Sequence, residues 1–221
     1  LFVKEGKDFK SRMGAHNRDT QMGWFIIIGT LPILIAGLLF KDAIESTLRN
    51  LWITVTVLII FGILLWVVDA RAKQVKTMDE MTWKDALIFG IGQMLALIPG
   101  VSRSGGTITF GRAMGYTREA AVRVSFLMAI PAVFGAGILE AVSAVKDVAA
   151  GNAGMFPGWG ATIAATIVAF VVGYVVIIGF LKFVSTFSYK AFAIYRIALA
   201  VVVALLLICG VLHPTEVVAA A

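Results

Sequence analysis

Long apolar runs separated by short polar segments dominate this chain. Five runs are long enough to cross a bilayer as helices, because one crossing needs about 20 predominantly apolar residues. They cover residues 22–40, 51–68, 119–145, 159–184 and 191–212. The pattern predicts an all-α integral membrane protein, folded as a polytopic helical bundle.

A sixth apolar stretch, residues 84–114, is interrupted in its middle. Its first half ends at Ile98 and is too short to span a bilayer, and Pro99 and Gly100 then break the helix before apolar residues resume. Irregular backbone at membrane depth is tolerated only where protein buries it or where it lines a wet cavity. We therefore predict a re-entrant broken-helix pair at 84–114, within a single transmembrane domain that covers residues 1–221.

Composition and charge support this architecture. Residues are 60% hydrophobic and only 14% charged, and the net charge is +6, whereas about 25% of the residues of soluble domains are charged. Basic residues concentrate in one set of connections, and only Lys41, Arg49 and Lys146 lie on the other side, so the basic side is predicted to be cytoplasmic. This assignment holds only if the pair at 84–114 enters and leaves on the same side. The aromatic residues lie inside apolar runs, so the bilayer is the expected partner and nucleic acid is not.

The interruption itself carries the candidate chemistry. A half-helix that starts at Ser104 would point unpaired backbone N–H groups and the positive end of its dipole at the loop, an arrangement that binds phosphate. Gly105 and Gly106 allow close approach of a ligand, Ser102 and Ser104 add hydroxyls, and Arg103 offers a planar fork that matches phosphate oxygens. These residues together predict a phosphate-binding cradle within the membrane.

Simpler interpretations exist for each polar residue. The loop is alternatively a kinked helix whose arginine extends toward the headgroups. Gln93 either bonds the ligand or joins neighbouring helices. Tyr195 and Arg196 are expected to anchor the cytoplasmic start of the last span.

The acidic residues do not suggest a catalytic or metal site. They lie in or beside a basic cytoplasmic loop, where they are expected to be solvated; they are Asp69, Asp79, Glu80 and Asp85. We predict no metal ligands in this chain, and we find no group that would activate a nucleophile.

Several segments give the chain a family resemblance. The run Pro-Gly-Val-Ser-Arg-Ser-Gly-Gly-Thr at 99–107 is the most specific, and further matching segments lie at 81–86, 93–97, 125–131 and 192–196. In these residues the chain resembles the bacitracin-resistance family of undecaprenyl pyrophosphate phosphatases, and the likeness covers nearly all of it. The resemblance implies an inverted-topology repeat with two re-entrant helix pairs.

The same resemblance implies a function and a site. The family hydrolyses undecaprenyl pyrophosphate, a lipid, to undecaprenyl phosphate and inorganic phosphate, recycles the carrier for cell-wall synthesis, and confers bacitracin resistance. It implies catalytic roles for Ser102 and Arg103, with Ser104, Gly105 and Thr107 as neighbouring anion contacts; Gly106 and Gln93 complete our expected substrate-binding set. The resemblance also implies a divalent cation, Mg²⁺ or Ca²⁺, and a location in the bacterial plasma (inner) membrane. The oligomeric state stays open, with a homodimer as one possibility.

One departure from the family pattern matters. Family members carry an earlier motif with two glutamates four residues apart, followed by a Pro-Val-Ser-Ser-Thr-Gly-His run, and that motif does not occur here. The resemblance therefore leads us to expect an N-terminally truncated member that lacks part of the first repeat and the cation ligands, and that is inactive or nearly so by itself.

A different class of function also fits a phosphate cradle. Broken helices whose N-termini face an anionic substrate are common in inverted-repeat carriers. An inverted-repeat transporter or flippase for lipid phosphates or small anions is therefore the alternative to the enzyme.

Overall fold

The computed structural model describes residues 18–151 and 157–215, and these residues form helices joined by short turns. Five helices are long and apolar enough to cross a membrane: α2 (Arg18–Leu39), α4 (Leu51–Arg71), α7 (Arg118–Ala149), α8 (Trp159–Thr186) and α9 (Lys190–Ile208). They correspond to the five predicted spans, so the all-α, polytopic membrane fold is confirmed.

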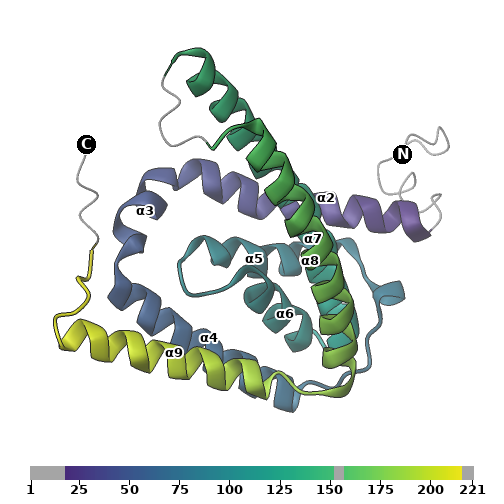
Figure 1. Ribbon diagram of the computed structural model, residues 1–221. Coiled ribbons are helices and arrows are strands. Elements are labelled where there is room, and N and C mark those ends of the chain that lie inside the picture. Colours follow the sequence, from purple (N-terminus) through teal and green to yellow (C-terminus); the bar gives the residue numbers. More distant parts are fainter. Residues whose placement is uncertain (1–17, 152–156, 216–221) are drawn as a thin grey trace.

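The shorter elements lie between these spans. They are α3 (Lys41–Glu45), η1 (Thr47–Arg49), η2 (Met78–Glu80), α5 (Trp83–Met94), η3 (Leu95–Leu97) and α6 (Arg103–Ala113). Neither α5 nor α6 is long enough to span a bilayer, since an α-helix rises about 1.5 Å per residue. The long helices frame this central pair, with α2 on one side, α4 and α9 together on another, and α7 and α8 on a third (Figure 1).

Side-chain caps define where several helices begin. Asn50 accepts a hydrogen bond from the backbone N–H of Trp52 ahead of α4. Thr82 and Asp85 bond each other's backbone N–H groups at the start of α5, and Thr117 caps α7 by accepting from Ala120. Such caps satisfy donors that the first turn of a helix leaves without partners. The starts of α4, α5 and α7 are therefore each fixed by a side-chain cap.

The central pair enters and leaves the bundle at the same end. Lys76, ahead of α5, and Tyr116, after α6, form a parallel backbone bridge. The N–H of Lys76 donates to the carbonyl of Gly115 at 3.0 Å, and the N–H of Thr117 donates to the carbonyl of Lys76 at 2.9 Å. The two connecting segments that join the pair to the spans are thus hydrogen-bonded to each other, as the predicted re-entrant pair requires.

Candidate functional site at the start of helix α6

The turn between η3 and α6 has an unusual backbone. Gly100 has a φ of +99°, which glycine adopts at little cost, and a Cβ at that position would lie only 2.7 Å from the carbonyl oxygen of Thr54 on α4. Ser102 has a φ of +67°. A non-glycine residue in such a conformation costs on the order of 1–3 kcal/mol and persists where its surroundings hold it, often at functional sites.

This turn delivers the N-terminus of α6 to the interior of the bundle. The helix begins at Arg103, one residue before the predicted start, with Ser102 as its N-cap. The Oγ of Ser102 accepts from the N–H of Gly105 at 3.3 Å, and the carbonyl of Ser102 accepts from the N–H of Gly106 at 2.8 Å. The N–H groups of Arg103 and Ser104 have no acceptor within the helix, so α6 presents free donors and the positive end of its dipole.

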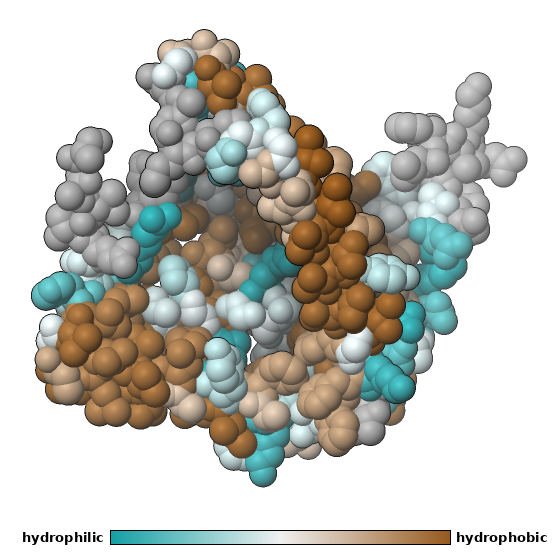
Figure 2. Space-filling view, in the orientation of Figure 1, coloured by the Kyte–Doolittle hydropathy of each residue, from teal (hydrophilic) through white to brown (hydrophobic). Residues whose placement is uncertain are grey.

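A cavity of about 350 Å³ lies beside this helix start, between α4, α6 and α9. Ser102, Ser104 and Gly105 line it, and α9 contributes Tyr195 and Arg196. The remaining lining is mostly apolar: Leu58, Leu65, Ile108, Phe180, Tyr189, Phe192 and Leu199. In the space-filling view, hydrophilic residues gather in a hollow of the face that the apolar surfaces of α8 and α9 border (Figure 2). We call the cavity of about 350 Å³ the polar cavity, after its hydroxyl and guanidinium groups.

Arg196 is the cationic group of the polar cavity, and the sequence interpretation missed this role. Its side chain is buried, its Nη2 donates to the carbonyl of Gly100 at 2.5 Å, and its Nη1 would lie 2.5 Å from a Cβ at position 105. Its Nε finds no partner among the described residues. The expected anchoring role at the membrane surface is therefore wrong for Arg196. Its depth was a usable signal, because residue 196 lies six residues, or about 9 Å, inside α9.

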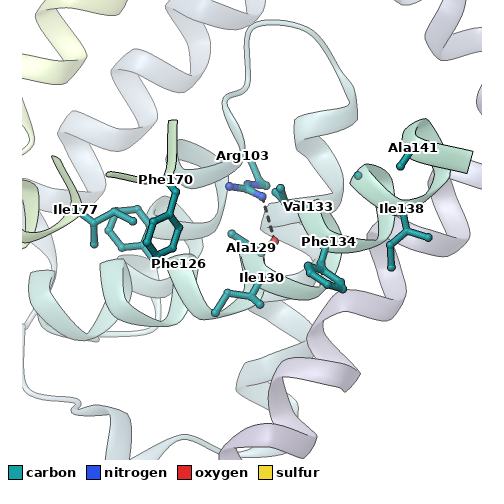
Figure 3. Close-up of a pocket in the computed structure, with 11 residues that line it drawn as sticks. Arg103, Phe126, Ala129, Ile130, Val133, Phe134, Ile138, Ala141, Phe170 and Ile177 are labelled. Carbon is teal, nitrogen blue, oxygen red and sulfur yellow. Dashed lines mark hydrogen bonds between the residues drawn. The ribbon is translucent and has the colours of Figure 1, made fainter. Parts of the chain in front are cut away.

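Arg103 occupies a different space. Its side chain lines a second cavity of about 790 Å³ between the start of α6, α7 and α8, and its Nη1 donates to the carbonyl of Ala129 at 3.4 Å (Figure 3). The structure thus separates Arg103 from its neighbours Ser102 and Ser104, which face the polar cavity. Both cavities meet the same helix start, one from the side of α4 and α9 and the other from the side of α7 and α8.

The other predicted site residues are buried where α5 and α6 pack against each other. Gly106 lies against the carbonyl of Gly92 on α5, and the hydroxyl of Thr107 donates to the carbonyl of Arg103 at 2.7 Å. Gln93 is fully buried, and within the described part of the chain neither its Oε1 nor its Nε2 has a hydrogen-bond partner. None of these three residues is among those that line the two cavities.

Two of the acidic residues differ from expectation. Asp69 is buried, and its Oδ1 accepts from the Nε of Arg112 at 2.9 Å and of Arg118 at 3.0 Å. Asp85 pairs with Lys76 at 2.8 Å. Burial by itself would raise the pKa of Asp85, but hydrogen bonds from Lys76 and Thr82 outweigh it and lower that pKa. The prediction that these two carboxylates are solvated is wrong, because cationic partners far along the chain fold onto them.

The residues around the cavities do not fit a divalent cation. Hard cations prefer carboxylate and carbonyl oxygens, whereas the polar groups here are hydroxyls, N–H groups and guanidinium ions. Across residues 18–151 and 157–215, no group of three or more His, Cys, Asp or Glu side chains is placed to hold a metal ion.

Known proteins place the chain in a family. Residues 2–202 match the family model described as "Bacitracin resistance protein BacA". An undecaprenyl-diphosphatase of Bifidobacterium animalis subsp. lactis is 78% identical over 216 residues, which is 98% of this chain and 72% of that protein. Undecaprenyl-diphosphatases of Bifidobacterium longum subsp. infantis and Pseudarthrobacter chlorophenolicus are 69% and 52% identical, over 96% and 91% of this chain and 71% and 72% of theirs. The chain therefore belongs to the bacitracin resistance protein BacA family.

Proposed function

We propose that this protein is an undecaprenyl-diphosphatase of the membrane. It hydrolyses undecaprenyl diphosphate to undecaprenyl phosphate and inorganic phosphate, which returns the lipid carrier to cell-wall synthesis and gives resistance to bacitracin. The observation that carries the proposal is the buried guanidinium of Arg196 beside the hydroxyls of Ser102 and Ser104 and the free N–H groups of α6. Such a set of donors favours a multiply charged anion.

The proposed chemistry follows from these donors. Hydrolysis forms a bond between the oxygen of water and the terminal phosphorus, breaks the bond from that phosphorus to the bridging oxygen, and leaves the protons of water on the two phosphate products. Charge on the phosphoryl oxygens must be neutralised throughout. Arg196, Ser102, Ser104 and the α6 N-terminus hold the diphosphate from the polar cavity, and Arg103 holds it from the second cavity. Gly105 supports the approach by leaving room beside Arg196.

The remaining predicted residues support the site indirectly in this proposal. Thr107 fixes the first turn of α6 through its bond to the carbonyl of Arg103, and Gly106 permits close packing on α5. For Gln93 to contact the substrate, its buried side-chain amide must rotate toward residues 99–102.

The proposal includes a dependence of the hydrolysis rate on a divalent cation, which can be measured. We expect Mg²⁺ or Ca²⁺ to raise the rate, as the family resemblance implies. Because the described residues do not fit such an ion, no step of the proposed chemistry passes through it.

The surroundings of the protein complete the proposal. The multi-pass membrane fold suits a lipid substrate, and we propose the bacterial plasma membrane as its location and a homodimer as its assembly. A transporter is not favoured, since the relatives are named as diphosphatases.

The test measures phosphate release from farnesyl diphosphate by the purified protein in detergent. We expect Arg196→Ala to lower kcat by about 10²–10³, the usual effect of removing a donor to developing negative charge. Arg123→Ala is the matched control, because Arg123 is exposed and, among the described residues, forms an ion pair with Glu119 alone, in the i,i+4 manner. Transfer of the lipid between the leaflets of vesicles that contain the protein, without phosphate release, would instead identify a flippase and reject the proposal.

A further inference from the structure

The second cavity has the shape of a long trough. Its α7 wall consists of residues spaced three or four apart, which therefore share one helix face, and its other wall comes from α8. The α7 residues run from Phe126 to Ala141, about 22 Å along the helix. The trough is lined by Phe126, Ala129, Ile130, Val133, Phe134, Gly137, Ile138, Ala141, Phe170 and Ile177, together with Arg103. We call it the α7–α8 groove.

Small residues make the trough hollow along its length. Ala129, Gly137 and Ala141 alternate with large side chains on the α7 face. A Cβ added at Gly137 would meet no atom within 4 Å, so the space above this position is open. Figure 3 shows Phe134 and Ile138 of α7 on one side of Arg103, and Phe170 and Ile177 of α8, together with Phe126, on the other.

The charge of the groove lies beside Ala129, three residues from the Phe126 end of its α7 wall. Arg103 is the charged residue among the described residues that line it, and the others are apolar. Its Nη1 bond to the carbonyl of Ala129 is long, at 3.4 Å, so the guanidinium keeps donors for an anion. Gly137 and Ala141 lie about 12 and 18 Å beyond Ala129 along α7. A cation beside an apolar trough complements an amphiphile with an anionic head and a long hydrocarbon tail.

The neighbouring polar cavity indicates where the anionic head of that amphiphile would lie. Ser102 and Ser104 face the polar cavity, whereas Arg103, between them in the chain, faces the groove. An anion at the start of α6 therefore touches both spaces. We propose that the α7–α8 groove binds the isoprenyl tail of the substrate while its diphosphate lies at the α6 N-terminus. The proposal rests on the proposed function and adds a tail site to it.

The experiment uses a photoreactive substrate analogue. Farnesyl diphosphate with a diazirine on its terminal isoprene unit is irradiated with the protein in detergent, and labelled peptides are mapped by mass spectrometry. We expect label on residues 133–141 of α7 and 170–177 of α8. Gly137→Phe should reduce this label at least fivefold, because position 137 lines the groove and its added Cβ would meet no atom within 4 Å, which leaves the larger side chain open space to occupy.

Gly135→Phe is the matched control. Position 135 lies on the same helix, its added Cβ also meets nothing within 4 Å, and it is not among the residues that line the groove. We expect Gly135→Phe to keep the label within twofold of the parent, and thermal unfolding of both variants confirms that they fold. Equal loss of label in the two variants, or label spread over all five spans, would overturn the tail site.

Two further arms separate this proposal from its alternatives. If excess phosphatidylglycerol competes with the label, the groove binds bulk lipid and the proposal is overturned. If Gly137→Phe abolishes a dimer without loss of label, the groove contacts a second copy of the chain and the proposal is likewise overturned. Phosphate release is measured in parallel. Groove label without any release would reject the proposed function alone, whereas release without groove label would reject the tail site alone.

Discussion

At the scale of single residues, two arginines flank the start of α6 and are held to different degrees. Arg196 is buried and donates to Gly100 at 2.5 Å, whereas Arg103 makes a bond of 3.4 Å to Ala129. Arg196 therefore also supports the turn itself, while the guanidinium of Arg103 can move toward a ligand at small cost. This difference makes Arg103 the better position at which to test how the anion is recognised.

We predict that Arg103→Lys does not restore activity. An ammonium ion is a point charge, whereas a guanidinium offers two parallel donors in a plane that matches two phosphate oxygens. We expect kcat/KM for farnesyl diphosphate to fall at least tenfold, in phosphate-release assays, and Arg123→Lys on the exposed face of α7 to leave it unchanged. Turnover near the parent value by Arg103→Lys would contradict bidentate recognition.

At the scale of helices, glycines set how closely the re-entrant pair packs. Gly106 on α6 lies against the carbonyl of Gly92 on α5, and Gly90 on α5 lies against the carbonyl of Gly29 on α2. Without side chains at these crossings, the three backbones approach closely, as small residues allow in membrane bundles. The position of the α6 N-terminus therefore depends on these two glycine contacts, of which the one at Gly106 lies in the first turn of α6.

We predict that Gly106→Ala destabilises the protein by about 1–3 kcal/mol, the usual cost of overpacking a close contact. The new methyl group would overlap the carbonyl oxygen of Gly92. Gly23→Ala on α2 is the control, since its methyl group meets nothing within 4 Å and alanine favours a helix by up to about 1 kcal/mol. Thermal unfolding in detergent measures both, and a Gly106→Ala variant as stable as the control would show that the helices can separate at this crossing.

At the scale of the whole molecule, one buried carboxylate joins the basic ends of several helices. Asp69 at the end of α4 binds Arg112 of α6 and Arg118 of α7, and its Oδ2 accepts from the backbone N–H of Tyr189 ahead of α9 at 3.2 Å. Arg112 is fully buried and also donates to the carbonyls of Asp69 and Tyr116. The cluster fixes the far end of α6, and with it the depth to which the α6 N-terminus reaches.

We predict that Asp69→Asn lowers stability by about 3 kcal/mol, because it leaves two arginines in a buried site without their anion. Asp79→Asn should change stability by less than about 0.5 kcal/mol, since Asp79 is exposed. Denaturation in detergent, followed by circular dichroism, compares the two. An equal small effect in both variants would mean that the arginines are held by backbone carbonyls alone.

The membrane architecture and the central motif follow from local patterns along the chain. Each span is a run of apolar residues long enough to cross a bilayer, and the break at Pro99 and Gly100 combines a missing donor with a positive φ. The same-side entry of the pair was predictable from charge, because basic residues on both sides of 84–114 had to share one face of the membrane.

Local patterns along the chain thus specify which long segments are helices and where the central stretch breaks, since these depend on hydrophobic length and local backbone chemistry. The tertiary structure alone decided that Arg196 approaches a turn 96 residues away, that Arg103 faces a different cavity from Ser102, and that Asp69 is buried between two arginines. These outcomes depend on how distant helices pack, because close packing brings together side chains that no local pattern relates.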